Sequence, residues 1–215
     1  LTAMADFAAE AGFGGVDLSL DRYDRFDEFL VMVLYAFRMR CDRLGLTVPV
    51  CHLPFFMPDP DDRAAMSRFA REQTEALETA ARLSIPCAVI HPVVRHGSRC
   101  TGRQWFDENI AVLTPLRERA EQLGVTLCIE NMTGQPYPGS PGETVYGSLP
   151  KHLRALADRL DAGICWDFGH AHLTGVNQTE ALAAVGSRLR AVHIHDNDGK
   201  SDQHLLPGFG TIRWL

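Results

Sequence analysis

The stretch "QLGVTLCIEN", residues 122–131, contains the end of a helical pattern, a glycine, a short apolar run and an acidic residue, in that order. Gly124 is typical of the residue that follows a helix, and the apolar run is typical of a strand buried on both faces. Such strands occur where helices cover both sides of a parallel sheet. The stretch therefore predicts a helix end followed by a parallel strand, with Glu130 at the strand's C-terminal end.

A helical pattern that ends near a glycine or a small turn, followed by a short apolar run, recurs five more times along the chain. The further copies are "AEAGFGGVDLSL" (9–20), "RLGLTVPVCH" (43–52), "RLSIPCAVIH" (82–91), "RLDAGICWDFGH" (159–170) and "GSRLRAVHIHD" (186–196). Segments between them, such as residues 62–83, carry apolar residues at helical spacing. Six strands of about five residues that alternate with helices predict an α/β fold with a parallel sheet.

A residue of a metal-ligand type stands at the end of five successive predicted strands, or one step beyond. These residues are His52, His91, Glu130, Asp167 and His193. In a barrel the C-terminal ends of all strands converge on one site. An open doubly wound sheet gathers its ligands at one switch point, usually with a glycine-rich phosphate loop, and no such loop follows the first predicted strand. The pattern therefore favours a TIM (β/α)8 barrel.

The number of strands is two short of a complete barrel. The chain opens on a helical pattern and stops at "GTIRWL", about where the last helix of a barrel would begin. We expect a single TIM-barrel domain over residues 1–215 that lacks the first and last strands. A six-stranded open barrel is the less favoured alternative, because closure removes exposed sheet edges.

Composition narrows the function classes. The chain is 46% hydrophobic and 22% charged, as expected for a globular protein, and it has no apolar run long enough to span a membrane and no signal-peptide pattern. A net charge of −6 without a basic stripe argues against nucleic acid as a partner. Six widely spaced cysteines without a CxxC pair suit reduced thiols in a cytoplasmic protein.

Three groups of polar residues carry the candidate chemistry. His193 and His195 are two apart and should share one strand face, with His195 further out; a pair of core histidines is the alternative. Asp167 and His170 are three apart at a strand end, where Asp167 capping the next helix is the alternative. Glu130 closes a buried strand, where an unpaired carboxylate is costly, so a metal or a basic partner is expected.

The loop "SDQHLLPGFG", residues 201–210, adds Asp202 and His204, for which a solvated loop is the alternative. With His170, they are candidates for a second cation site or a clamp on substrate hydroxyls. Mixed histidine and carboxylate ligands suit Zn²⁺, Mn²⁺, Co²⁺ or Fe²⁺ better than Ca²⁺. The sequence therefore predicts one divalent metal, and a second remains open.

Several segments together resemble the xylose isomerase-like TIM barrel superfamily, which joins sugar phosphate isomerases and epimerases with endonuclease IV-class nucleases. They are "EAGFGGVDLSL", "VCHLPF", "VIHP", "IEN", "CWDFGHAH", "VHIHD" and "DQHLLPGFGTIRW". The resemblance implies that Glu130, Asp167 and His193 hold one divalent metal, with a fourth ligand expected from a last strand that this chain does not contain. In the three-metal nucleases, the positions that match His52, His91, His170, Asp202 and His204 also bind metal.

We therefore expect a metal-dependent sugar or sugar-phosphate isomerase or epimerase that works through an enediolate, with Glu130 and His170 as catalytic residues. The expected substrate-binding residues are His52, His91, His195, Asp202 and His204. Phe55, Phe56, Trp105 and Trp166 are candidates for the pocket wall, although core packing is favoured for Trp166. Residues 133–150 are a candidate lid, with a plain surface connection as the alternative. The expected partner is a small sugar or sugar phosphate, and neither nucleic acid nor a membrane is expected to bind. Whether the protein forms a homo-oligomer is left open. The alternatives are an endonuclease IV-like nuclease, a dehydratase or a subunit of a sugar-modifying complex.

Overall fold

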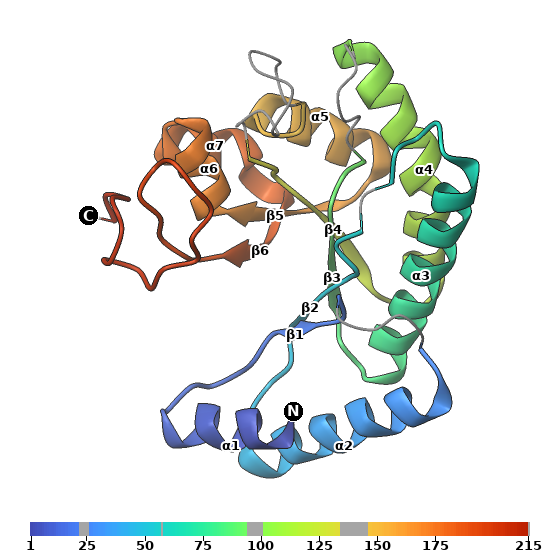
Figure 1. Cartoon of the computed structure of the whole chain (residues 1–215), viewed down its shortest axis with the longest axis vertical. Helices are drawn as coiled ribbons and strands as arrows, with labels where there is room; N and C mark the ends of the chain where they lie inside the picture. The colour runs from blue at the N-terminus through green and yellow to red at the C-terminus, as the bar shows by residue number, and fades with distance from the viewer. Residues whose placement is uncertain (22–25, 57, 94–100, 134–145, 215) are drawn as a thin grey trace.

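The computed structural model describes the chain except for residues 22–25, 57, 94–100, 134–145 and 215 (Figure 1). It contains one six-stranded sheet in which every pair of neighbouring strands is parallel and the strands follow sequence order. The strands are β1 (Leu18–Ser19), β2 (Val50–His52), β3 (Cys87–Ile90), β4 (Thr126–Glu130), β5 (Gly163–Asp167) and β6 (Leu189–His193). The predicted number and direction of the strands are confirmed.

The helices surround the strands on the outer side of a curved sheet (Figure 1). They are α1 (Thr2–Glu10), α2 (Glu28–Leu44), α3 (Arg63–Arg82), α4 (Gly102–Gln122), α5 (Pro150–Leu160), α6 (Phe168–Thr174) and α7 (Gln178–Val185), with a 3₁₀ turn at Gly186–Arg188. The curvature brings β3 and β6 into contact, although they are not neighbours in the sheet. The fold is thus a partial TIM barrel, as expected.

Strand alternation separates two apolar regions. Ile129 and Trp166 are fully buried in the large core that the helices share with the outer face of the sheet. Cys128 and Cys165 belong to a smaller cluster on the other face. Because successive side chains point to opposite faces of a strand, Glu130 shares the inner face with Cys128. Alternation along each strand therefore directs the residues at the strand ends toward the interior.

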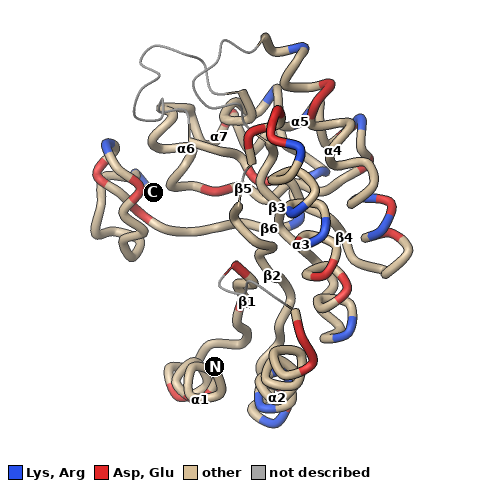
Figure 2. Tube along the Cα trace, turned by 45° about the vertical axis from the view of Figure 1, so that its right-hand side comes forward, with Lys and Arg blue, Asp and Glu red and all other residues tan. Residues whose placement is uncertain are grey.

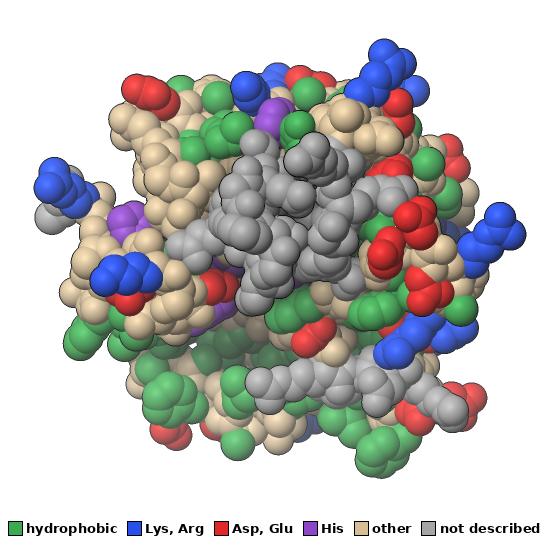
Figure 3. All heavy atoms as spheres, turned by 45° about the horizontal axis from the view of Figure 1, so that its top comes forward, with side chains coloured by type: hydrophobic (Ala, Val, Ile, Leu, Met, Phe, Trp, Pro, Cys, Tyr) green, Lys and Arg blue, Asp and Glu red, His purple; other side chains and the backbone are tan. Residues whose placement is uncertain are grey.

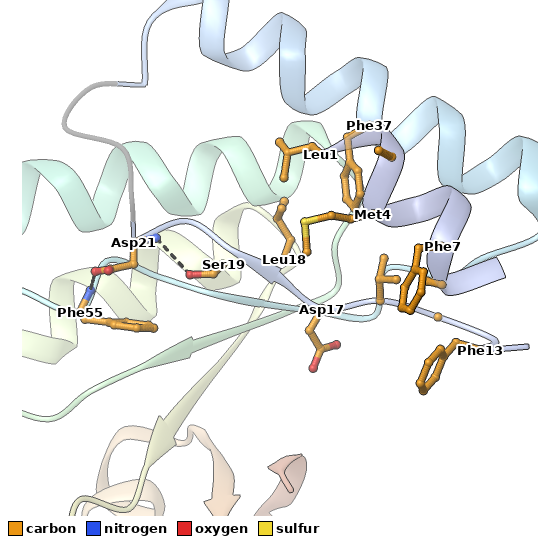
Figure 4. Close-up of a pocket in the computed structure, with 14 residues that line it drawn as sticks. Leu1, Met4, Phe7, Phe13, Asp17, Leu18, Ser19, Asp21, Phe37 and Phe55 are labelled. Atoms are coloured by element: carbon orange, nitrogen blue, oxygen red, sulfur yellow. Dashed lines mark hydrogen bonds between the residues drawn. The ribbon is translucent and has the colours of Figure 1, made fainter. Parts of the chain in front are cut away.

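Strands β4, β5 and β6 have the expected five residues, but β1 has two and β2 has three. Within the described residues, β1 pairs only with β2. An apolar pocket of about 880 Å³ lies along this edge strand (Figure 4). Its lining includes Met4 and Phe7 of α1, Phe37 of α2, and Phe55. The short, one-sided pairing of β1 leaves the apolar faces around it incompletely covered.

The five described cysteines, Cys41, Cys51, Cys87, Cys128 and Cys165, are buried and have free thiols, in line with the expected reduced state. Cys100 lies outside the described residues. No helix in the part of the chain that the structure describes is long and apolar enough to cross a membrane.

Candidate metal centre

Glu130 lies at the centre of the strand ends. Its side chain is only 2% exposed, and histidines from three other strand ends surround its carboxylate. Oε2 lies 2.9 Å from His52 Nε2 and 3.2 Å from His91 Nε2, and Oε1 lies 3.0 Å from His193 Nδ1. Figure 3 shows histidine and acidic side chains together beside a hollow in one face of the molecule. The residues at the ends of β2, β3, β4 and β6 therefore form one cluster.

Asp167 uses its two carboxylate oxygens differently. Oδ1 accepts a hydrogen bond from the backbone N–H of His170 at 2.7 Å and so caps α6. Oδ2 faces His195 Nε2 at 3.0 Å and His193 Nδ1 at 3.6 Å. The helix cap that the sequence left as the alternative is therefore present, but it occupies one oxygen and leaves the other directed at the histidines.

The loop after β6 folds back over this cluster, as expected. Its Asp202 places Oδ2 3.3 Å from His170 Nε2 and 3.2 Å from His204 Nε2. The rings of His195 and His204 stack with centroids 4.0 Å apart and 4° between their planes. The loop histidine and aspartate thus form a second group of ligand-type side chains beside the first.

His195 lies beyond the last residue of β6, yet its side chain is less exposed than that of His193. The side chain of His195 is 8% exposed, whereas that of His193 is 23% exposed. Strand β6 ends at His193, and Asp196 then pairs with Leu205 in an antiparallel bridge. This bridge brings the loop over His195, whose ring stacks with that of His204 and is therefore less exposed than the ring of His193.

Of the four aromatic residues proposed for the pocket wall, Phe55 adjoins the cluster. The centroid of its ring lies 4.2 Å from the ring centroid of His52 and 5.3 Å from that of His91. Phe55 is 42% exposed. Trp166 is fully buried in the core, and Trp105 is buried and stacks with Tyr146. The Phe56 ring lies under the Arg68 guanidinium. The wall prediction is wrong for Trp105, which helix α4 directs into the core, whereas the core position favoured for Trp166 is confirmed. Most of the predicted lid, residues 134–145, lies outside the described residues.

Two buried polar residues, Asn131 and Asp196, have no role assigned from the sequence. Asn131 is fully buried; its amide donates to the Asp167 carbonyl at 2.9 Å and accepts from the Asp167 N–H at 2.6 Å. Its own carbonyl faces His170 Nδ1 at 2.8 Å. Asn131 therefore fixes both Asp167 and His170. The only signal in the sequence was its position directly after Glu130.

Asp196 organises the loop that carries Asp202 and His204. Its fully buried carboxylate accepts hydrogen bonds from the backbone N–H groups of Asn197, Gly208 and Ile212, and from Trp214 Nε1. Gly208 has a φ of +88°, which favours glycine and lets the chain turn back. Burial alone would raise the pKa of Asp196, but these four donors hold it far below its usual range.

Replacing Asp196 by Ala should lower the free energy of unfolding by about 3 kcal/mol, because it leaves several buried donors without an acceptor. Asp198→Ala is the matched control, since Asp198 accepts backbone hydrogen bonds in the same loop but is exposed. Urea denaturation of both variants measures the difference. Equal loss of stability in the two variants would contradict the role assigned to Asp196.

The electrostatics of the cluster favour charged carboxylates. Burial would raise the pKa of Glu130, but hydrogen bonds from His193, His52 and His91 hold it well below its usual range. Burial would also raise the pKa of Asp167, but hydrogen bonds from His193 and His195 lower that pKa to about 2. The cluster thus presents two buried anionic groups to whatever occupies the space between the strand ends.

Two histidines have the hydrogen-bond pattern of metal ligands. His52 Nδ1 lies 2.7 Å from the Leu53 carbonyl, and His170 Nδ1 lies 2.8 Å from the Asn131 carbonyl, so each donates from Nδ1. In a neutral imidazole that donates from Nδ1, the other nitrogen is an acceptor. Burial lowers the pKa of His52, so its Nε2 carries a lone pair, yet this atom faces the Glu130 carboxylate. A cation held by His52 and Glu130 would resolve this opposition.

The donor set therefore fits a divalent cation. Among the residues that the structure describes, three groups have ligand atoms within 4.8 Å of one another: Glu130, Asp167 and His193; His52, His91 and Glu130; and His195, Asp202 and His204. Their mixed nitrogen and oxygen donors suit Zn²⁺, Mn²⁺, Co²⁺ or Fe²⁺.

Metal uptake should release protons. Burial lowers the pKa of His193, but Asp167 and Glu130 outweigh it and raise that pKa far above its usual value, so the metal-free imidazole is protonated at neutral pH. A metal ligand must be deprotonated, so affinity should rise with pH, about tenfold per unit for each proton displaced. Calorimetric titration in buffers of different ionisation enthalpy measures the protons released. Uptake without proton release near pH 7 would contradict ligation by His193.

With this geometry established, comparison with known proteins defines the class. Residues 5–214 match the xylose isomerase-like TIM barrel family, and the chain belongs to that family. Uncharacterized protein MJ1311 of Methanocaldococcus jannaschii is 31% identical over 195 residues, which are 85% of this chain and 62% of that protein. The chain thus spans less than two thirds of this relative's length.

Solved structures agree with the family assignment. A D-tagatose 3-epimerase-like protein is 26% identical with a TM-score of 0.81, covering 99% of this chain and 78% of the other. The TTHB071 protein from Thermus thermophilus, soaked with ZnCl₂, is 25% identical with a TM-score of 0.73, covering 98% and 81%. A family 2 AP endonuclease from Brucella melitensis, at 18% identity and a TM-score of 0.65 with 91% and 73% covered, shares the fold alone. The neighbours thus include sugar epimerases and a nuclease.

Proposed function

We propose that this protein is a divalent-metal-dependent isomerase or epimerase of a ketose or ketose phosphate. The observation that carries the proposal is the buried Glu130 carboxylate, which histidines from β2, the end of β3 and β6 surround within 3.2 Å. The similarity to a D-tagatose 3-epimerase-like protein supports sugar chemistry. The chain spans less than two thirds of the length of the relative MJ1311, so the activity of the whole protein is itself a proposal.

Glu130, Asp167 and His193 would hold the metal. When bound there, a divalent metal would polarise the substrate carbonyl and stabilise the negative charge of an enediolate. The Glu130 carboxylate is the proposed base for the C–H proton beside that carbonyl, since its low pKa keeps it ionised at neutral pH.

His170 is the proposed acid. Burial lowers the pKa of His170, but the neighbouring Asp202, Asp167 and Glu130 raise it to about 9, so that the metal-free imidazole is protonated at neutral pH. A protonated imidazole can donate to a substrate oxygen. His52, His91, His195, Asp202 and His204 remain candidates for substrate hydroxyls or for a second cation. The exposed face of Phe55 beside His52 and His91 would pack against the sugar carbons.

The test uses the full protein loaded with Mn²⁺, Zn²⁺ or Co²⁺ and a panel of ketoses and ketose phosphates in D₂O. Proton abstraction beside the carbonyl should place deuterium at that carbon, and epimerisation should produce a second sugar, both visible by NMR. Absence of exchange with every sugar and metal of the panel would reject the isomerase proposal.

A nuclease is the second candidate, because His170, His195, Asp202 and His204 form a further ligand group beside the first. The charge pattern opposes it. Figure 2 shows the positions of basic residues interspersed with those of acidic residues along the helices, and the net charge is −6. Phosphate contacts supply most of the affinity for DNA.

We therefore expect no incision of a duplex that contains an abasic site, and no complex with it in a gel shift at low salt. The same metal-loaded protein serves for both the sugar and the DNA assays. Robust incision would reverse the order of the two candidate functions.

A further inference from the structure

A pair of thiols lies in the barrel interior, outside the ligand cluster. Cys87 at the start of β3 and Cys128 in β4 have their Sγ atoms 3.2 Å apart. Cys128 is fully buried and Cys87 is 8% exposed, and both belong to the small apolar cluster on the inner face of the sheet. Cys128 precedes Glu130 by two residues, so the pair lies one layer below the strand ends. The proposed sugar chemistry does not use either thiol.

The strand register opposes a direct bond between these sulfurs. Cys87 is opposite Thr126, so Cys128 is two residues further along β4. Parallel strands about 4.8 Å apart with a rise of about 3.3 Å per residue place the two Cα atoms about 8 Å apart. Two cysteines whose Cα atoms are more than about 7 Å apart cannot form a disulfide without backbone movement. The two sulfur atoms are therefore in contact, but the separation of their strands opposes a disulfide bond between them.

One bridging atom would bond both sulfurs without moving either strand. Thiolates select soft, thiophilic partners. Zinc takes four ligands, but none of the groups of three or more ligand-type side chains among the described residues includes these cysteines. Trivalent arsenic that already carries one organic substituent needs only two thiolates. Its pyramidal geometry, with bond angles near a right angle, brings those two sulfurs close together.

We propose that Cys87 and Cys128 form a dithiol site that binds a monosubstituted trivalent arsenical. The residual exposure of Cys87 is the point of entry for the reagent. The hydrogen bond from the Cys128 thiol lowers the pKa of Cys87, which makes Cys87 the first nucleophile. With an organic arsenoxide, two S–H bonds break and two As–S bonds form. The arsenoxide oxygen leaves as water with both thiol protons, and arsenic stays trivalent.

The experiment uses phenylarsine oxide and the full chain in a Cys100→Ser background, because Cys100 lies outside the described residues. Native mass spectrometry should show one arsenical per folded chain, retained in excess glutathione and removed by a small dithiol. Cys87→Ser and Cys128→Ser should each abolish the retained adduct. Cys165→Ser is the matched control, since Cys165 is equally buried on the inner face but lies outside the Cys87–Cys128 pair, and it should keep the adduct.

Circular dichroism before and after treatment shows whether each variant is folded. Failure of the folded parent chain to bind, or retention of the adduct in either single variant, would overturn the proposal. Loss of two hydrogens in mass on treatment with peroxide would also overturn it, because that result identifies a disulfide that the strand register should prevent. The readout is mass, so it is independent of any sugar isomerase activity.

Discussion

Glu130→Gln should reduce the proposed isomerase activity by about 10³- to 10⁴-fold, because the change removes both a general base and an anionic ligand. The amide keeps the size of the side chain but replaces one acceptor oxygen with a donor. Three histidine nitrogens approach that carboxylate within 3.2 Å. The variant should therefore also lose metal affinity.

Turnover of the sugar that proves active and metal content by elemental analysis together check this prediction. Glu72→Gln is the control, since Glu72 is also buried but pairs with Arg68 on α3, away from the cluster. It should leave both quantities close to those of the parent chain. Activity of Glu130→Gln within about tenfold of the parent would mean that another group removes the proton.

His193→Ala should remove most of the bound metal, whereas His204→Ala should leave it in place and impair turnover. His193 lies between the two buried carboxylates, 3.0 Å from Glu130 and 3.6 Å from Asp167. The His204 side chain is 65% exposed, and its contact with the clusters runs through Asp202 and the ring of His195. Substitution of a residue that only hydrogen-bonds to a metal ligand already lowers metal affinity by about 10- to 100-fold. Loss of a ligand should exceed that range.

Competition with a chromophoric chelator measures the two affinities under the same conditions. His172→Ala is the control for loss of an imidazole, because His172 pairs with Thr211 outside the ligand groups. If the metal survives His193→Ala and is lost with His204→Ala, the primary site is built from the loop and the assignment of the strand-end ligands is wrong.

The strand-end cluster was predictable from the sequence because it follows from two local periodicities. Apolar runs buried on both faces specify parallel strands, and the carboxyl ends of parallel strands meet on one side of the sheet. Glu130 and Asp167 could thus be placed together although they end different strands, β4 and β5. The family resemblance added the proposed roles of these residues, which the spacing could not.

Contacts that depend on loop paths and side-chain directions were not predictable. Asn131 acts through hydrogen bonds to a neighbouring strand end, and Asp196 through donors up to 18 residues ahead, so no local pattern predicts these contacts. His195 is buried because of the bridge between Asp196 and Leu205, which the period of the strand does not encode.

The sequence by itself determined the order of the strands and the inward direction of the ligand-type residues, because these depend on alternation and residue type. Only the tertiary structure decided which histidine faces which carboxylate, which aromatic ring borders the site and that Cys87 meets Cys128. Those pairings depend on the register between strands and on the return of a loop, and both are set by packing across the whole sheet.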